Sequence, residues 1–138
     1  MRSVTCCFTG HRPEAFDFGY NEDAPGCEKL KSDLEKTILR AAQAGYTHFI
    51  TGMALGVDMW CAEIVLRLRD GGLPLTLEAA VPAAGQTRSW NAEQKERHAQ
   101  ILSVCEESYA TSNPTRGSAK ELRDNSITFH GNNLMRIG

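Results

Sequence analysis

The chain has no long apolar run, no leader-like start and no excess of either charge. No stretch reaches the ~20 consecutive apolar residues of a membrane-spanning helix, and Met1 is followed almost at once by a strand-like pattern. We therefore expect a cytoplasmic protein. Lys and Arg number 15 and Asp and Glu 17, a formal net charge of −2, so the basic surface of a DNA-binding or membrane-binding protein is absent. The expected partner is a small phosphorylated ligand, with no role for a membrane or for nucleic acid.

The spacing that marks disulfide or metal frameworks is also missing. Cysteines are odd in number and no two are spaced as C-x-x-C, and the four histidines include no i, i+4 pair. The cysteines are Cys6, Cys7, Cys27, Cys61 and Cys105. We expect reduced thiols and no metal. Cys6 and Cys7 lie in an apolar strand pattern, where a thiol behaves as a small hydrophobic group.

What the sequence has is an alternation of short apolar runs and amphipathic segments. Strands are predicted over residues 4–9, 48–51, 75–81 and 108–111. Helices are predicted over residues 27–44, 57–69 and 91–105. This β-α-β-α-β-α-β order is typical of an α/β protein with right-handed parallel crossovers. We expect a three-layer, Rossmann-like fold with an open, mainly parallel sheet.

A chain of 138 residues with 41% hydrophobic residues suits a single domain. We expect the Rossmann-like domain to extend over residues 1–112. Residues 113–138, rich in Asn, Ser, Gly and Arg, are expected to be a polar C-terminal segment of the same domain. That segment predicts only a short helix near residues 119–123.

Glycines and polar residues follow the first two predicted strands. Gly10, His11 and Arg12 leave the first strand, and Gly52 and Gly56 leave the second. The carboxyl ends of parallel strands meet at one edge of the sheet, where ligands bind in this fold class. Glycines before a helix let a phosphate approach unpaired N–H groups, and an arginine adds forked donors. Tight turns also need glycine for steric reasons alone, so that alternative stays open.

Four further side chains have two interpretations each. Asp58, in the first turn of a predicted helix, stabilises the helix start, or accepts ribose hydroxyls or holds Arg12. His11 contacts a ligand or ends the strand. His48, at the opposite end of a strand, is expected to be structural, and Trp60 is expected to pack in the core rather than to stack on a base.

The segments FTGHRP and TGMALGVD, with Val81, Pro82, Gln86 and Trp90, resemble the SLOG superfamily in its YpsA-like branch over roughly residues 3–112. The resemblance implies a Rossmann-like domain that binds a nucleotide or an ADP-ribose-like ligand, and no further cofactor. It places ligand contacts at Gly10, His11, Arg12, Gly52, Gly56, Asp58, Gln86 and Trp90.

The end of the chain departs from this resemblance. Members of the branch continue with another strand and a Gly-Gly-Thr turn, whereas HGNNLMRIG echoes only an Arg-Asn segment. We therefore expect a shortened C-terminal part and an open edge on the last strand. A second copy of the chain, in a homodimer, or the polar tail would cover that edge.

Three functions fit these features. The first is a nucleotide sensor whose surface a protein partner reads, with no catalytic residue. The second is an N-glycosidic hydrolase similar to the LOG-type phosphoribohydrolases, but their P-G-G-x-G-T-x-x-E motif does not occur in the sequence. The third is single-stranded DNA binding as in the DprA proteins, which needs a basic stripe with interleaved aromatic residues that the sequence lacks.

Overall fold

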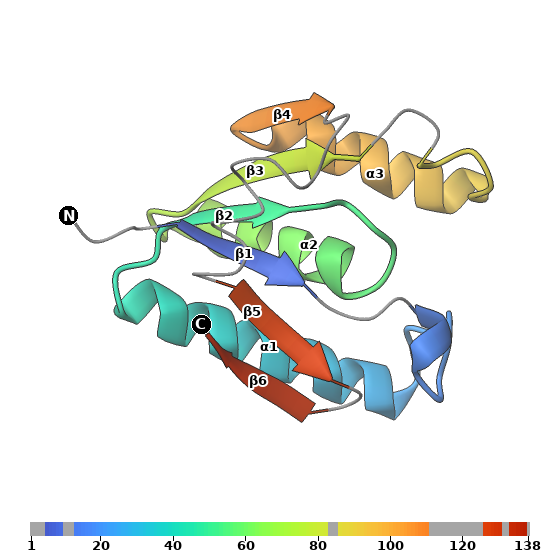
Figure 1. Ribbon diagram of the computed structural model, residues 1–138, viewed down its shortest axis with the longest axis horizontal. Coiled ribbons are helices and arrows are strands. Elements are labelled where there is room, and N and C mark those ends of the chain that lie inside the picture. Colours follow the sequence, from blue (N-terminus) through green and yellow to red (C-terminus); the bar gives the residue numbers. More distant parts are fainter. Residues whose placement is uncertain (1–4, 10–12, 83–85, 111–125, 131–132, 138) are drawn as a thin grey trace.

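The computed structural model describes residues 5–9, 13–82, 86–110, 126–130 and 133–137 (Figure 1). Helices and strands alternate as far as the fourth strand. The elements are β1 (Thr5–Thr9), the 3-10 helix η1 (Pro13–Ala15), α1 (Pro25–Gln43), β2 (His48–Thr51), α2 (Val57–Asp70), β3 (Thr76–Val81), α3 (Ala92–Val104), β4 (Glu107–Ala110), β5 (Ser126–His130) and β6 (Asn133–Ile137). The three predicted helices and the four predicted strands are confirmed, and their ends differ from the observed ends by at most two residues.

The six strands form one open sheet in the order β4-β3-β2-β1-β5-β6. All neighbours are parallel except β6, which runs antiparallel to β5. The predicted Rossmann-like α/β fold with a mainly parallel sheet is therefore confirmed. The edges of the sheet are β4 and β6, and the homodimer stays a prediction.

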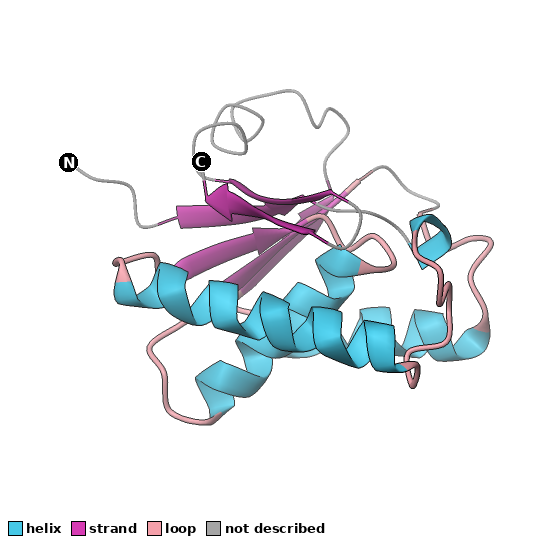
Figure 2. Cartoon of the chain, turned by 90° about the horizontal axis from the view of Figure 1, so that it is seen from below, coloured by secondary structure: helices cyan, strands magenta, loops and turns pink. Residues whose placement is uncertain are grey.

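The three described α-helices cover one face of the sheet (Figure 2). The described residues thus form two layers, and the third layer expected from the sequence is not found among them. The chain steps from β1 to β2, β3 and β4 in one direction, and right-handed crossovers made in one direction place their helices on the same side. In the sheet, β5 lies on the other side of β1 from β4. The intervening residues 111–125 lie outside the described residues, as does the helix predicted at 119–123.

The strands β5 and β6 correct the sequence analysis, which predicted no strand after residue 111. β5 pairs with β1, with Cys7 opposite Ser126 and Thr9 opposite Thr128, and β6 returns beside β5. The strands β5 (SITFH) and β6 (NLMRI) are only five residues long each. They were missed because each is short and lies within a polar C-terminal stretch, and a short strand can be stabilised by a neighbour that is distant in sequence.

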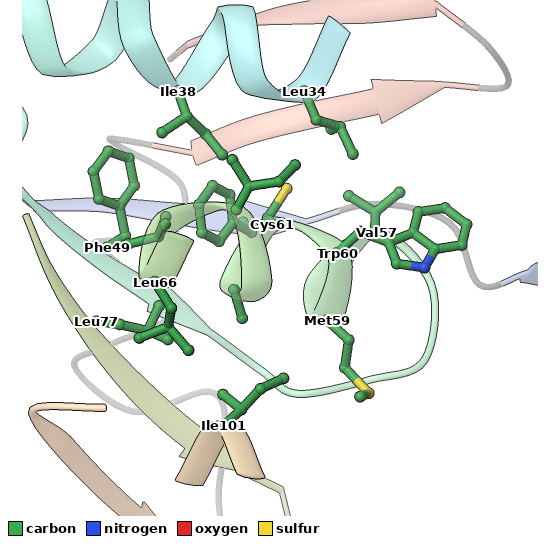
Figure 3. Packing of buried hydrophobic residues seen from close by; sticks show 14 of the residues in the cluster. Leu34, Ile38, Phe49, Val57, Met59, Trp60, Cys61, Leu66, Leu77 and Ile101 are labelled. Atoms are coloured by element: carbon green, nitrogen blue, oxygen red, sulfur yellow. The ribbon is translucent and has the colours of Figure 1, made fainter. Parts of the chain in front are cut away.

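The hydrophobic core lies between this sheet and the helices (Figure 3). From α1 it receives Leu34 and Ile38, which are at most 1% exposed. Phe49 of β2 stacks on Phe8 of β1 with ring centroids 5.5 Å apart. α2 is the most apolar helix because it lies between α1 and α3 and contacts three strands. Its Trp60 is 2% exposed, which confirms a core position.

All five cysteines are free thiols, and four of them are buried, as predicted. Burial raises the pKa of the Cys6 thiol to about 12, even though a hydrogen bond with the Cys7 backbone acts in the opposite direction. The Cys6 thiol is therefore protonated near neutral pH and serves as a packing group. No helix in the described part of the chain has both the length and the apolar character that crossing a bilayer requires.

Candidate functional site

The strand order places the candidate site at the carboxyl ends of β1, β2 and β3. β2 lies on one side of β1 and β5 on the other, so the strand order reverses at β1, where open α/β sheets bind ligands. Gly10, His11 and Arg12 follow β1 directly at this point. These three predicted site residues lie outside the described residues, and their ligand contacts stay a prediction.

The loop between β2 and α2 is anchored by Thr51, which is fully buried. Its hydroxyl accepts a hydrogen bond from the Met53 N–H at 3.2 Å and donates one to the Asp58 carbonyl at 3.0 Å. One side chain thus ties the start of the loop to the first turn of α2. The loop backbone is unusual, because Met53 has a φ of 62° and Gly56 a φ of 95°.

The two predicted glycines in this loop are needed for different reasons. Gly56 precedes α2 with φ 95° and ψ −134°, a conformation that only glycine adopts readily. Gly52 is needed because of its surroundings, since a Cβ there would lie 3.1 Å from Asp58 Oδ2. The Asp58 carboxylate therefore lies directly over Gly52.

Gln86, the first described residue after the β3 loop, reaches back to this glycine loop. Its Nε2 donates a hydrogen bond to the Gly52 carbonyl at 3.0 Å. That bond sets the amide orientation and leaves Oε1 as an acceptor. Oε1 is buried and has no hydrogen-bond partner among the residues described. A buried acceptor without a donor is costly, and at a sheet edge it indicates a place for a ligand or a water.

A pocket of about 200 Å³ opens at this edge. Its walls are formed by Glu14, Tyr20, Ala54, Leu55, Gln86, Ser89, Trp90 and Gln94. A smaller recess of about 20 Å³ shares Tyr20, Leu55 and Gln94 with it and adds Gly56. Two predicted residues, Gln86 and Trp90, thus line the pocket. Asp58 does not, since its carboxylate lies over Gly52.

Glu14, Tyr20 and Gln94 are pocket residues that the sequence analysis missed. Glu14 belongs to η1, just after the GHRP segment, and accepts a hydrogen bond from the Tyr20 hydroxyl. Tyr20 is 54% exposed. The only sequence signal for Tyr20 was its position as an aromatic residue in a polar segment before a helix. The neighbouring sequence does not indicate which surface such a side chain contacts.

Ion pairs hold the segment that carries Glu14 and Tyr20. Arg97 of α3 donates to Glu22 at 2.5 Å and to Glu63 of α2 at 2.5 Å, and Lys31 of α1 donates to Glu22 at 2.7 Å. The hydrogen bonds with Glu63 raise the pKa of Arg97, against the effect of burial. Burial acts to raise the pKa of Glu22, but the hydrogen bonds from Arg97 and Lys31 outweigh it and lower that pKa. Glu22 is thus ionised and joins α1 and α3, and Arg97 extends the cluster to Glu63 of α2.

Trp90 and His48 differ in their relation to the pocket. Trp90 lines it and contacts His98 edge-on, with ring centroids 5.4 Å apart; burial lowers the pKa of His98. His48 lies at the amino end of β2, where its ring nitrogens meet Thr76 Oγ1 at 2.6 Å and Glu78 Oε1 at 2.8 Å. His48 is therefore structural, as predicted.

A larger cavity, about 580 Å³, lies between α2 and α3, and none of the predicted site residues lines it. Size alone is a poor guide here, because the smaller pocket has the glycine loop and the buried acceptor. In the described ranges no group of three or more His, Cys, Asp or Glu side chains could hold a metal ion.

Comparison with known proteins agrees with this architecture. A family model described as the YspA SLOG family matches residues 6–128. The chain is 30% identical over 95 residues to a UPF0398 protein of Bacillus pumilus (strain SAFR-032), covering 68% of this chain and 50% of the relative. It is 31% identical over 96 residues to one of Bacillus cereus (strain B4264), covering 69% and 51%. The chain spans about half the length of these relatives, whose name identifies no ligand or reaction.

Proposed function

The chain belongs to the YspA SLOG family, and from this membership and the site geometry we propose that it binds a nucleotide or a nucleotide-derived phosphorylated ligand. The observation that carries the proposal is the Gln86 Oε1 acceptor at the carboxyl edge of the sheet, which is buried beside a glycine loop without a partner in the described part of the chain. A site that needs no ligand would satisfy such a group internally.

The phosphate fits best at the start of α2. No side chain caps this helix at Gly56, and the first N–H groups of a helix together with its dipole attract anions. The phosphate therefore lies toward the glycine loop, and Arg12 is predicted to contact it.

The uncharged part of the ligand fits the pocket. Its volume of about 200 Å³ is below the roughly 300–1,000 Å³ typical of sites for drug-sized ligands. The pocket thus accepts one portion of a nucleotide. Trp90 and Tyr20 supply apolar ring surface, and Gln86 supplies a hydrogen-bond acceptor.

We favour a sensor over a hydrolase. Glycosidic cleavage commonly uses a pair of placed carboxylates, which stabilise a positively charged ribosyl centre and activate water. Asp58 lies over Gly52 and does not line the pocket, so Glu14 is the one carboxylate among the described residues that line it. A sensor needs only binding, and the ion pairs of Glu22 link the pocket segment to α1 and α3. Through them a ligand can alter a helical surface that a protein partner reads.

Calorimetry with AMP, ADP, ATP and ADP-ribose tests the proposal. We expect micromolar binding of at least one, and a loss of roughly 1.5–3 kcal/mol in the Arg12→Ala variant because a charge-assisted hydrogen bond is removed. Arg40→Ala is the matched control, since Arg40 lies in the last turn of α1, near the amino end of β2. No binding of any of these nucleotides, or equal losses in both variants, would contradict it.

A further inference from the structure

The helix α3 buries fewer side chains than the other two α-helices. Of its 13 residues only His98 and Ile101 are buried, whereas α1 buries six residues and α2 eight. A surface helix commonly buries roughly three to four residues in every two turns. Val104, at the end of α3, is 39% exposed. The side of α3 that faces α2 is therefore incompletely covered in the described part of the chain.

The space left there is the cavity of about 580 Å³ between α2 and α3, which we call the α2–α3 groove. Leu66, Ile101 and Val104 supply its apolar lining. On α3 the lining extends from Glu93 to Val104, a separation of ~16 Å along a helix. The α2–α3 groove is thus about three helical turns long.

The side chains around the α2–α3 groove make it acidic. Four carboxylates and two guanidinium groups line it. Both guanidinium groups are already in ion pairs, Arg67 with a glutamate of α1 and Arg97 with two glutamates. The exposed carboxylates of Glu93 and Glu96 make no ion pair in the described part of the chain. An occupant that carries lysine or arginine beside an apolar face therefore complements the groove.

A helix suits this groove better than an extended segment does. Both walls are α-helices, whose backbone groups bond within each helix, so the walls offer no strand edge with which an extended peptide could pair. A helical occupant satisfies its own backbone groups. It can also insert side chains spaced i, i+3, i+4 and i+7 between the two walls.

We propose that the α2–α3 groove binds a basic amphipathic helix of a protein partner. The inference rests on the sensor role in the proposed function, which needs a surface that a partner reads. Arg97 connects this surface with the ligand site, because it lines both the α2–α3 groove and the small recess beside Gly56. A second copy of the chain complements the groove less well, since its own net charge is −2 and like charges repel.

The test is fluorescence anisotropy with a labelled peptide of about 14 residues, ~21 Å long as a helix. The peptide has leucine at positions i, i+3, i+4, i+7 and i+11 and lysine elsewhere. We expect a Kd of about 100 µM or lower, as in weak transient complexes. A peptide with glutamate in place of lysine, and one of the same composition in a non-amphipathic order, should each bind at least about 10-fold more weakly.

Two variants with matched controls locate the binding surface. Val104→Lys places a charge in the apolar lining, and Leu73→Lys makes the same change at a residue that is 37% exposed and lies outside the groove. Glu96→Lys reverses a charge at the groove, and Glu107→Lys reverses one on β4. We expect Val104→Lys to weaken binding of the lysine peptide about 10-fold and Glu96→Lys about threefold or more, with both controls within about twofold of the parent. If Val104→Lys does not fold, Glu96→Lys and its control decide.

Three results would overturn the inference. The first is equal binding of the lysine and glutamate peptides, and the second is parental affinity in both groove variants. The third is a parent dimer in light scattering that Val104→Lys converts to a monomer, because a second copy would then fill the groove. These titrations contain no nucleotide, so their failure leaves nucleotide binding standing. Peptide binding at the groove without binding of any nucleotide would overturn the proposed ligand and support the docking surface.

Discussion

Replacing Thr51 by valine removes one buried hydroxyl and leaves the shape of the side chain almost unchanged. That hydroxyl accepts the Met53 N–H at 3.2 Å and donates to the Asp58 carbonyl at 3.0 Å. Both Thr51 and Met53 are fully buried, so no water replaces the lost acceptor. The substitution therefore releases the anchor of the loop that contains Gly52 and Gly56.

The expected loss of stability depends on the two backbone groups that lose their hydrogen-bond partner. A buried N–H without an acceptor costs about 1–3 kcal/mol. The Asp58 carbonyl keeps its bond within α2, so it adds little. The new methyl group contributes up to about 0.8 kcal/mol of apolar burial in the opposite direction. We expect Thr51→Val to lower the free energy of unfolding by about 0.5–2 kcal/mol.

Urea unfolding and nucleotide titration of the same samples check this. Thr51→Ser is the matched control, since it keeps the hydroxyl and loses a methyl group, at a cost of about 0.8 kcal/mol. The two variants should thus have similar stability losses but different affinities. Nucleotide binding should fall severalfold in Thr51→Val and stay near the parent in Thr51→Ser.

Two outcomes would refute the reasoning. Parental stability and affinity in Thr51→Val would show that the hydroxyl does not hold the loop. An equal loss of affinity in both variants would show that packing, rather than hydrogen bonding, positions it.

Three further predictions concern the loop, the ion pairs and the chemistry. Gly56→Ala should destabilise the domain by about 1–3 kcal/mol because of its positive φ, whereas Gly71→Ala, at φ −79°, should cost less; equal losses in thermal unfolding would exclude backbone strain. The fold lowers the pKa of the Glu22 carboxyl below its ordinary value of 4.5. The ionised carboxylate therefore stabilises the fold above about pH 4.5, and this stabilisation is lost as the pH falls through the folded pKa. The stability gap between the parent and Glu22→Gln, from urea unfolding, should thus shrink between about pH 6 and about pH 3; a constant gap would contradict the ion pairs. Release of free base from nucleoside monophosphates should stay below ~1 s⁻¹, and faster release that disappears in Asp58→Asn would favour the hydrolase.

Much of the fold is decided by local patterns that can be read from the sequence. Leu30, Leu34 and Ile38 recur at helical spacing, and this fixes the inner face of α1 before any partner is known. Gly52 and Gly56 follow a strand and precede a helix, so a turn at the carboxyl edge is expected from chain geometry alone. The resemblance added Gln86 and Trp90, and both line the pocket.

Contacts between distant segments decided the rest. β5 and β6 were not predicted because each is only five residues long within a polar stretch. Their stability comes from pairing, β5 with β1, more than a hundred residues earlier in the chain, and β6 with β5. Glu14 and Tyr20 were missed for a related reason. Glu22 holds their segment through an ion pair with Arg97, 75 residues away in sequence. An ion pair between residues so far apart produces no periodic pattern in the sequence that would predict it. Local sequence patterns therefore determine the helical faces and the glycine turns. Contacts between distant segments determine the pocket wall and the last two strands of the sheet.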